Sequence, residues 1–160
     1  MKAVILLNQN EQQNIEAVVE NLCNEGIGEF IIFSYAYKKS QEFADKLEKI
    51  GVKATFIDLN RKISTFDALD LIRGSLENTF LLVYSERVGE FDINDAHFYH
   101  KSSGTVATLL SNDKLTAGIF LESDIFDYMI VPSHFERVIL KRIFEDNEAN
   151  IYNALTYEIY

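Results

Sequence analysis

The chain has 160 residues, of which 48% are hydrophobic and 25% charged, and this ordinary globular composition predicts a single domain over residues 1–160. Its formal net charge of −10 argues against nucleic acid and anionic membranes as partners, because both require a basic face. One cysteine permits neither an intramolecular disulfide nor a cysteine-based metal site, and the sequence contains no long apolar run or signal-peptide pattern, so we expect a cytoplasmic protein.

The opening apolar run, Lys2–Leu7, lacks alternation and is typical of a buried parallel strand. Ligands of open α/β sheets bind beyond the carboxyl ends of the strands, so residues 8–14 should form a functional loop. This loop reads Asn-Gln-Asn-Glu-Gln-Gln-Asn and contains no Gly, Ser, Thr, Lys or Arg. It therefore lacks the flexible backbone and the positive charge with which phosphate-binding loops hold an anion.

Strands and helices then alternate. Further buried strands are predicted at Glu29–Ser34, Val52–Leu59 and Thr79–Tyr84, and the partial alternation of Val52–Leu59 places it nearer an edge. Helices are expected after the 8–14 loop, over Ser40–Ile50, and after a cap at Ser64 or Thr65, and a fourth is expected between Asp92 and Gly104. Their inward residues are predicted to be Ile15, Val18, Val19 and Leu22; Phe43, Leu47 and Ile50; and Phe66, Leu69, Ile72 and Leu76.

The last third departs from this pattern. Thr105–Leu110 and Leu115–Leu121 are predicted to pair as antiparallel strands, followed by short helices over Ser123–Ile130 and Ser133–Asp146 and a strand near Asn150–Leu155. The second helix should be capped by Ser133. Together the elements predict an α/β protein: a three-layer α/β/α Rossmann-like fold with a mostly parallel mixed sheet of about seven strands.

Several isolated residues have both a chemical and a structural interpretation. His97 and His100 lie three apart on a predicted helix, but no third metal ligand has suitable spacing, which favours a surface or helix-face pair. Asp58 ends a strand as a phospho-acceptor would, but the acidic cluster that such chemistry needs is missing after the first strand. Cys23 is expected to be a buried, inert thiol.

A series of segments resembles the sugar-1-phosphate nucleotidylyltransferases, in particular the glucose-1-phosphate cytidylyl- and thymidylyltransferases. The resemblance covers nearly the whole chain and implies the nucleotidyltransferase fold. The segments are MKAVIL at 1–6, VVENLCNEGIGEFII at 18–32, FLLVYSERV at 80–88, FDI at 91–93, FYHK at 98–101, TAGIF at 116–120, IFDY at 125–128 and FE at 135–136.

The resemblance implies a degenerate active site. The family's glycine-rich loop, with its arginine and lysine, is replaced by residues 8–14, so no residue inherits either cation. The family's nucleotide-recognising glycine motif corresponds to Ser64–Leu69, where both glycines are gone. Glu86 stands at the family's metal-ligand position, with only Glu158 near the second one, and Thr116 stands at a sugar-contacting position. A vestigial substrate pocket would be lined by Asn8, Gln9, Ser64, Thr65 and Thr116.

These points favour a catalytically inactive relative that binds a protein partner or a small ligand in sugar-nucleotide or polysaccharide metabolism, with no catalytic residue, metal or cofactor. One alternative is an active enzyme that forms an NDP-sugar from NTP and sugar 1-phosphate, using Mg²⁺ at Glu86 and cations from a partner chain. Another is a sensor of a nucleotide or sugar phosphate. The expected protein partners are a second copy or a nucleotidyltransferase-family protein, and Tyr152, Tyr157 and Tyr160 are a candidate association surface.

Overall fold

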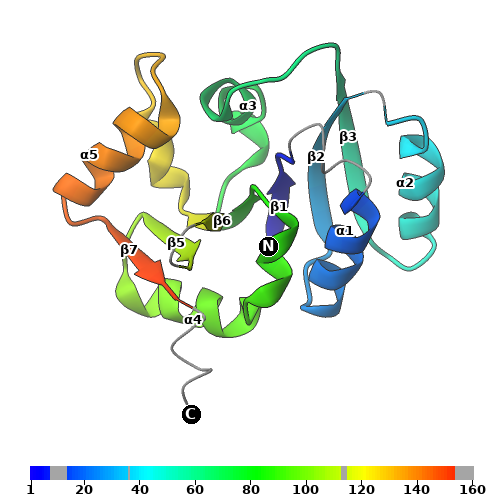
Figure 1. Cartoon of the computed structure of the whole chain (residues 1–160), viewed down its shortest axis with the longest axis horizontal. Coiled ribbons are helices and arrows are strands. Elements are labelled where there is room, and N and C mark those ends of the chain that lie inside the picture. The colour runs from blue at the N-terminus through cyan, green and yellow to red at the C-terminus, as the bar shows by residue number, and fades with distance from the viewer. Residues whose placement is uncertain (8–13, 36, 113–114, 154–160) are drawn as a thin grey trace.

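The computed structural model describes residues 1–7, 14–35, 37–112 and 115–153 (Figure 1). These ranges form a seven-stranded mixed sheet in the order β3-β2-β1-β4-β6-β5-β7. The strands are β1 Lys2–Ile5, β2 Glu29–Tyr35, β3 Lys53–Leu59, β4 Phe80–Val83, β5 Ala107–Ser111, β6 Thr116–Leu121 and β7 Ala149–Tyr152. The expected α/β class and strand number are confirmed, and β3 is an edge strand, as its alternation predicted.

The helices cover both faces of this sheet. The α-helices are α1 Ile15–Asn24, α2 Ser40–Glu48, α3 Thr65–Leu71, α4 Ile93–Ser103 and α5 Leu140–Glu145. Short 3₁₀-helices are η2 Arg73–Ser75, η3 Glu86–Glu90 and η4 Ser123–Tyr128, and η5 Phe135–Ile139 is a π-helical turn that leads into α5. Figure 1 shows β3 at one edge of the sheet beside α2 and β7 at the other edge.

One strand of the sheet, β6, runs opposite to the other six. β3, β2, β1 and β4 are parallel, with Lys2 of β1 level with Glu29 of β2 and Phe80 of β4. β6 runs antiparallel to both β4 and β5, and β7 is parallel to β5. The antiparallel pairing predicted for the two late strands is therefore confirmed, while the first four strands follow the geometry of helical crossovers.

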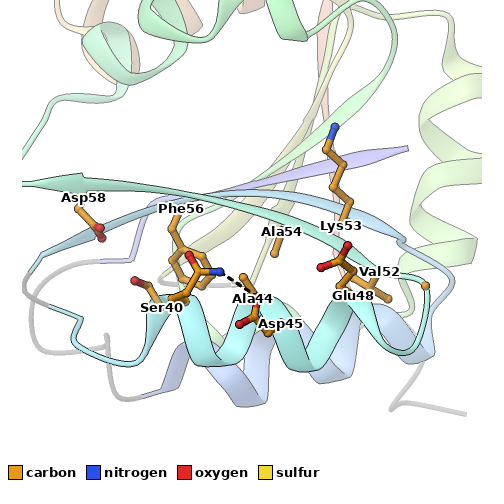
Figure 2. Close-up of a pocket in the computed structure, with 11 residues that line it drawn as sticks. Ser40, Ala44, Asp45, Glu48, Val52, Lys53, Ala54, Phe56 and Asp58 are labelled. Carbon is orange, nitrogen blue, oxygen red and sulfur yellow. Dashed lines mark hydrogen bonds between the residues drawn. The ribbon is translucent and has the colours of Figure 1, made fainter.

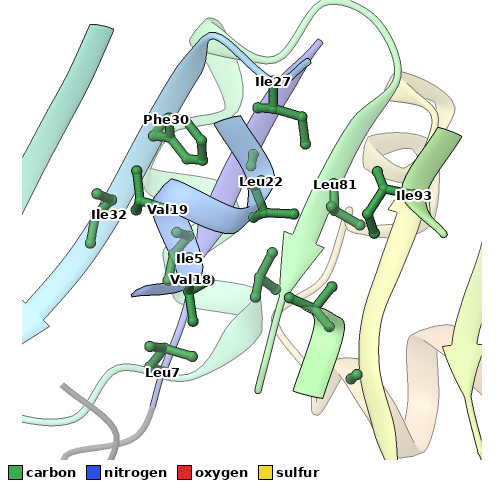
Figure 3. Packing of buried hydrophobic residues seen from close by; sticks show 14 of the residues in the cluster. Ile5, Leu7, Val18, Val19, Leu22, Ile27, Phe30, Ile32, Leu81 and Ile93 are labelled. Carbon is green, nitrogen blue, oxygen red and sulfur yellow. The ribbon is translucent and has the colours of Figure 1, made fainter. Parts of the chain in front are cut away.

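Two apolar cores sit on opposite faces because successive strand residues point to opposite sides. On one face α1, α2 and α4 cover residues such as Ile5 and Phe30; Figure 3 shows Val19 and Leu22 of α1 packed over them. On the other face α3 and α5 cover Val4 and its neighbours. Coverage of both faces explains why the central strands are apolar without alternation.

Local capping signals in the sequence are mostly confirmed. The Ser64 and Asp92 side chains cap α3 and α4 by accepting hydrogen bonds from the backbone N–H groups of Asp67 and Asp95. Gly104 ends α4 with a φ of +66°, a left-handed conformation that favours glycine. All four inward residues predicted for α1 are buried.

Two helix predictions need correction. Ile50 was predicted to face inward, but α2 ends at Glu48 and the Ile50 side chain is 69% exposed. Ser133 was predicted to cap the last helix, but this element begins at Phe135, and the ring Nδ1 of His134 accepts the capping bond from the Arg137 N–H at 3.1 Å. The imidazole nitrogen takes the role that a hydroxyl usually has.

The third helix is also shorter than its apolar pattern suggests. α3 ends at Leu71 and a 3₁₀ turn follows, yet Ile72 and Leu76 still point into the core. Residues 85–91, which link β4 to α4, contain η3 and the buried Val88. No helix among the described residues has the length and apolar character needed to cross a membrane.

Candidate functional site

The order of the strands locates a crevice between β1 and β4. The chain proceeds from β1 outward to β2 and β3, and then returns to place β4 on the other side of β1. The connections from the carboxyl ends of β1 and β4 therefore leave in opposite directions. This is the topological switch point at which open α/β sheets bind their ligands.

A pocket of about 430 Å³ lies at this point. Its walls come from the ends of β1, β2 and β4, from the approach to α3, and from the start of η5. The lining residues are Leu6, Leu7, Phe33, Tyr35, Lys62, Ile63, Ser64, Thr65, Tyr84, His134, Phe135 and Glu136. Most of this lining is apolar or aromatic, with a few polar groups, as in small-molecule sites generally.

A carboxylate organises the polar part of the pocket. Oε1 of Glu136 accepts hydrogen bonds from the Thr65 hydroxyl and, at 2.8 Å, from the Tyr84 hydroxyl. These bonds join the starts of α3 and η5 to the end of β4. Burial and the adjacent Glu136 charge hold the pKa of Tyr84 well above its usual value, so the phenol stays a hydrogen-bond donor.

His134 stands beside this cluster. Its Nδ1 is 3.5 Å from Oε2 of Glu136. The same nitrogen lies 3.1 Å from the backbone nitrogen of Arg137 and accepts its N–H. His134 therefore joins the start of η5 to the carboxylate side of the pocket.

Tyr35 carries a buried hydroxyl that lines the pocket. Its oxygen has no partner with hydrogen-bond geometry among the described residues. Burial raises the pKa of Tyr35, and the nearby backbone of Ile63 lowers it by a smaller amount. A buried polar atom without a full hydrogen bond is costly, and it is the kind of group that a bound ligand satisfies.

Lys62 is the pocket residue that sequence reasoning missed. It lines the crevice just before α3 and is the one lysine or arginine among the described lining residues. The sequence pattern pointed to residues 8–14 for a cation, because the nucleotidylyltransferases that the chain resembles carry their glycine-rich loop there. The position of Lys62 between a strand end and a helix cap was the available signal, but only the fold shows that this connection borders the crevice.

The five predicted pocket residues are distributed unevenly. Ser64 and Thr65 line the crevice, although the Ser64 hydroxyl is engaged in capping α3. Thr116 begins β6 and is outside the lining; its hydroxyl donates to Ser111 Oγ at 3.4 Å. Asn8 and Gln9 lie outside the described residues.

The structure also describes Glu86, the residue at the predicted metal-ligand position. Glu86 begins η3 and is exposed to solvent. Within the described ranges, no group of three or more His, Cys, Asp and Glu side chains is placed to hold a metal ion. Glu158, at the family's second metal position, lies outside those ranges, so a metal role for Glu86 stays a prediction.

His100 belongs to a buried network rather than to the surface. Its side chain is fully buried, with Nδ1 2.6 Å from Thr108 Oγ1 and Nε2 3.0 Å from Glu122 Oε1. The Lys101 ammonium and the Thr79 hydroxyl donate to the same Glu122 oxygen. Thr79 precedes β4, so the network lies at the opposite end of the sheet from the pocket.

The two histidines do share a helix face, as expected, but the surface part of that interpretation is wrong for His100. The ring of His97 stacks on Phe120, with ring centres 5.4 Å apart. Burial is the main cause that lowers the pKa of both histidines, although Glu122 opposes it. Both are therefore neutral, structural side chains near pH 7.

Three other predictions are settled by burial. Tyr152 was expected on an association surface, but it is buried and its hydroxyl donates to Asp95 Oδ2 at 2.6 Å; Tyr157 and Tyr160 lie outside the described residues. Cys23 is half-buried rather than buried, and burial with the nearby Glu20 raises its pKa, which disfavours the reactive thiolate. The Asp58 carboxylate is exposed and accepts the Ser34 hydroxyl at 2.7 Å.

Comparison with solved structures identifies the fold. A protein described as a glucose-1-phosphate thymidylyltransferase of Bacillus anthracis, solved with sucrose, superposes with a TM-score of 0.70 at 11% identity over 95% of this chain and 85% of that one. HddC of Yersinia pseudotuberculosis gives 0.62 at 12% identity, with 95% and 89% covered. The 4-diphosphocytidyl-2C-methyl-D-erythritol synthase of Anaerococcus prevotii gives 0.63 at 8%, with 95% and 85% covered.

The chain therefore has the nucleotidyltransferase fold, as its resemblance to sugar-1-phosphate nucleotidylyltransferases predicted. At these identities the likeness establishes the fold alone. No protein-family model matches the sequence, and no curated protein matches it either.

Proposed function

We propose that this protein is a catalytically inactive member of the nucleotidyltransferase fold that acts by binding. Its switch-point pocket takes a small neutral ligand with an apolar or aromatic part and hydrogen-bonding groups. The setting is sugar-nucleotide or polysaccharide metabolism in the cytoplasm, which the resemblance suggests and the acidic composition and single cysteine support. A second copy or a protein of the same fold is a candidate partner.

One observation carries the proposal: Glu136 and Lys62 are the carboxylate and the ammonium among the described lining residues. A nucleoside triphosphate brings several negative charges, and catalysis of phosphoryl transfer depends on cations placed around them. One exposed lysine and one carboxylate in the same lining supply almost no net positive field. The loop 8–14 adds no cation to this balance, because its sequence contains none.

The same lining suits a neutral ligand. Phe33, Tyr35 and Phe135 lie in the pocket wall and are almost fully buried, so the wall as a whole is the apolar surface for a flat ring or for the hydrophobic face of a sugar. Glu136 accepts hydrogen bonds from hydroxyl or amino groups, and the buried Tyr35 hydroxyl, which finds no partner within the described part of the chain, can bond to a ligand. This proposal requires neither a cofactor nor a metal ion.

An active enzyme is the second candidate, and the names of the structural neighbours favour it. Thymidylyl- and cytidylyltransfer chemistry appears in those names, and one HddC structure was solved with GMP-PN. Activity here would require Mg²⁺ at Glu86 and cations from a partner chain. The third candidate, a sensor of a nucleotide or sugar phosphate, requires the phosphate to bind near Lys62.

Thermal unfolding with four ligand sets separates these candidates. The sets are nucleosides, free sugars, sugar 1-phosphates and nucleoside triphosphates, each with and without Mg²⁺. Pyrophosphate release is followed separately with a triphosphate, a sugar 1-phosphate and Mg²⁺ supplied together. A ligand at 100 times its Kd adds about 2.7 kcal/mol of stability. We expect a metal-independent shift with an uncharged ligand and no pyrophosphate. Pyrophosphate release would establish the enzyme, and a shift confined to phosphorylated ligands would establish the sensor.

A further inference from the structure

β3 offers an open sheet edge. It is the last strand of the sheet, and no strand in the described part of the chain pairs with its outer side. The Lys53 N–H donates inward to Gly28 at 3.0 Å. Backbone groups of successive residues alternate between the two sides of a parallel strand, so those of Ala54, Phe56 and Asp58 face the open edge. Such an edge is a template for another strand.

A groove of about 640 Å³ runs along this edge between β3 and α2 (Figure 2). Its floor is apolar and includes Ala44, Ala54 and Phe56. The Phe56 ring is held in place by stacking on Tyr37, with ring centres 5.7 Å apart, and by edge contact with Phe43. A side chain that enters the groove therefore meets a preformed surface.

The rim of the groove is acidic. Asp45 and Glu48 come from α2, and Asp58 comes from the end of β3. Lys53 does not neutralise them. Its side chain extends to the side of the strand away from α2 (Figure 2), and its ammonium lies 3.7 Å from Glu29. The local charge therefore favours a cationic occupant.

We propose that the β3 edge binds an extended basic segment of a partner protein, which joins the sheet as an additional strand. Main-chain hydrogen bonds to Ala54, Phe56 and Asp58 supply the pairing, as in β-strand addition generally. Because strand side chains alternate, every second residue of the segment enters the groove. A lysine or arginine there lays its aliphatic stem on Phe56 and its charge beside Asp45 and Glu48. The alternate residues of the segment point to the opposite face of the sheet, beside Ile57 and Leu59, and these residues should be apolar.

A second copy of this chain fits the edge poorly. Twofold pairing of β3 with itself would bring the two α2 helices together over the new junction. Asp45 and Glu48 would then face the same carboxylates of the copy, and like charges in such positions are destabilising. The charge of the groove therefore selects a basic partner over self-association.

The test uses a labelled peptide of alternating lysine and valine, equal in length to β3, with binding followed by fluorescence anisotropy. We expect saturable binding that weakens with salt, and none with the alternating glutamate and valine peptide. Asp45→Lys should weaken binding about tenfold, because it replaces attraction with repulsion at the rim. Glu42→Lys makes the same charge change on α2 outside the groove lining and should have little effect.

Strand addition is tested by the backbone. Two further peptides carry N-methyl groups on the odd or on the even residues; one should lose binding and the other should retain it, because only alternate N–H groups face β3. The peptide should also slow amide exchange at Ala54, Phe56 and Asp58, whereas Thr55 and Ile57 already bond to β2.

Three results would overturn the inference. They are no binding of the lysine and valine peptide, equal binding of the two N-methylated peptides, and equal weakening by Glu42→Lys and Asp45→Lys. If the free protein self-associates and Asp45→Lys changes that self-association, the edge binds a second copy instead. The groove shares no lining residue with the switch-point pocket, so these outcomes leave the proposed function untouched.

Discussion

The Tyr84 hydroxyl donates a 2.8 Å hydrogen bond to Glu136 Oε1, and this bond ties the end of β4 to the start of η5 across the pocket. The two residues are 52 positions apart in the chain. Their contact places a negative charge inside the switch-point pocket.

Glu136→Gln should improve triphosphate affinity without a matching gain for an uncharged nucleoside, which loses Oε2 as a hydrogen-bond acceptor. The amide oxygen still accepts from Thr65 and Tyr84, so the pocket keeps its shape and loses one negative charge. Removing one repulsive charge at a partly exposed site is worth about 1 kcal/mol, or roughly fivefold in Kd. Isothermal titration with a triphosphate and its nucleoside measures both effects.

The control for this change is Glu145→Gln on α5, an exposed carboxylate outside the pocket lining. It alters the net charge of the protein equally. If both variants change triphosphate affinity by the same factor, the global charge rather than Glu136 opposes the anion.

Tyr35→Phe should stabilise the free protein by about 1 kcal/mol, because it removes a buried hydroxyl for which the described residues provide no properly placed partner. The same change should weaken any ligand that bonds to this hydroxyl. Urea unfolding measures the first effect. Tyr152→Phe provides the opposite control, since it deletes a 2.6 Å bond to Asp95 and should lower the free energy of unfolding. Destabilisation by Tyr35→Phe would show that the hydroxyl is satisfied in solution.

Stability should fall as the pH drops below about 6.5, the ordinary pKa of histidine. Burial makes the folded pKa of His100 lower than its unfolded pKa, so the unfolded chain binds the extra proton first. The stabilising contribution of neutral His100 is therefore complete above the unfolded pKa and is lost as the pH falls toward the folded one. His97 acts in the same direction.

A second loss should follow at lower pH. Hydrogen bonds from Thr79, Lys101 and His100 outweigh burial and lower the pKa of Glu122, so its contribution fades as the pH falls below about 4.5. Urea unfolding between pH 8 and 4 checks both steps. His100→Gln should flatten the upper step, whereas His134→Asn, which replaces an exposed capping ring by another capping residue, should leave it in place. An unchanged upper step in His100→Gln would contradict this account.

Gly118→Ala should destabilise the protein by about 2 kcal/mol, because overpacking of a tight core contact usually costs 1–3 kcal/mol. A Cβ at this position of β6 would lie 2.9 Å from the carbonyl oxygen of Leu82 in β4, and backbone of a central strand cannot move aside cheaply. Gly28→Ala is the matched control, since nothing lies within 4 Å of its Cβ. Equal unfolding midpoints for the two variants would refute the prediction.

The sequence by itself determined the local parts of this molecule. Apolar runs and helical periodicity predicted the elements, and Ser64, Asp92 and Gly104 marked helix ends, because capping and left-handed turns depend on neighbouring residues alone. The missing phosphate-loop chemistry of residues 8–14 is likewise a property of one short segment. The resemblance to nucleotidylyltransferases then supplied a fold that the superpositions confirm.

Only the tertiary structure decided which distant side chains share a site. Lys62, Tyr84 and Glu136 line one pocket because β4 returns to the far side of β1, and no local pattern reports that order. Periodicity placed His97 and His100 on one helix face but could not show that β5 and β6 would enclose His100, since burial depends on what packs against a helix. The chemistry of each side chain is set by its own residue, whereas the order of the strands decides which side chains lie together and which are buried.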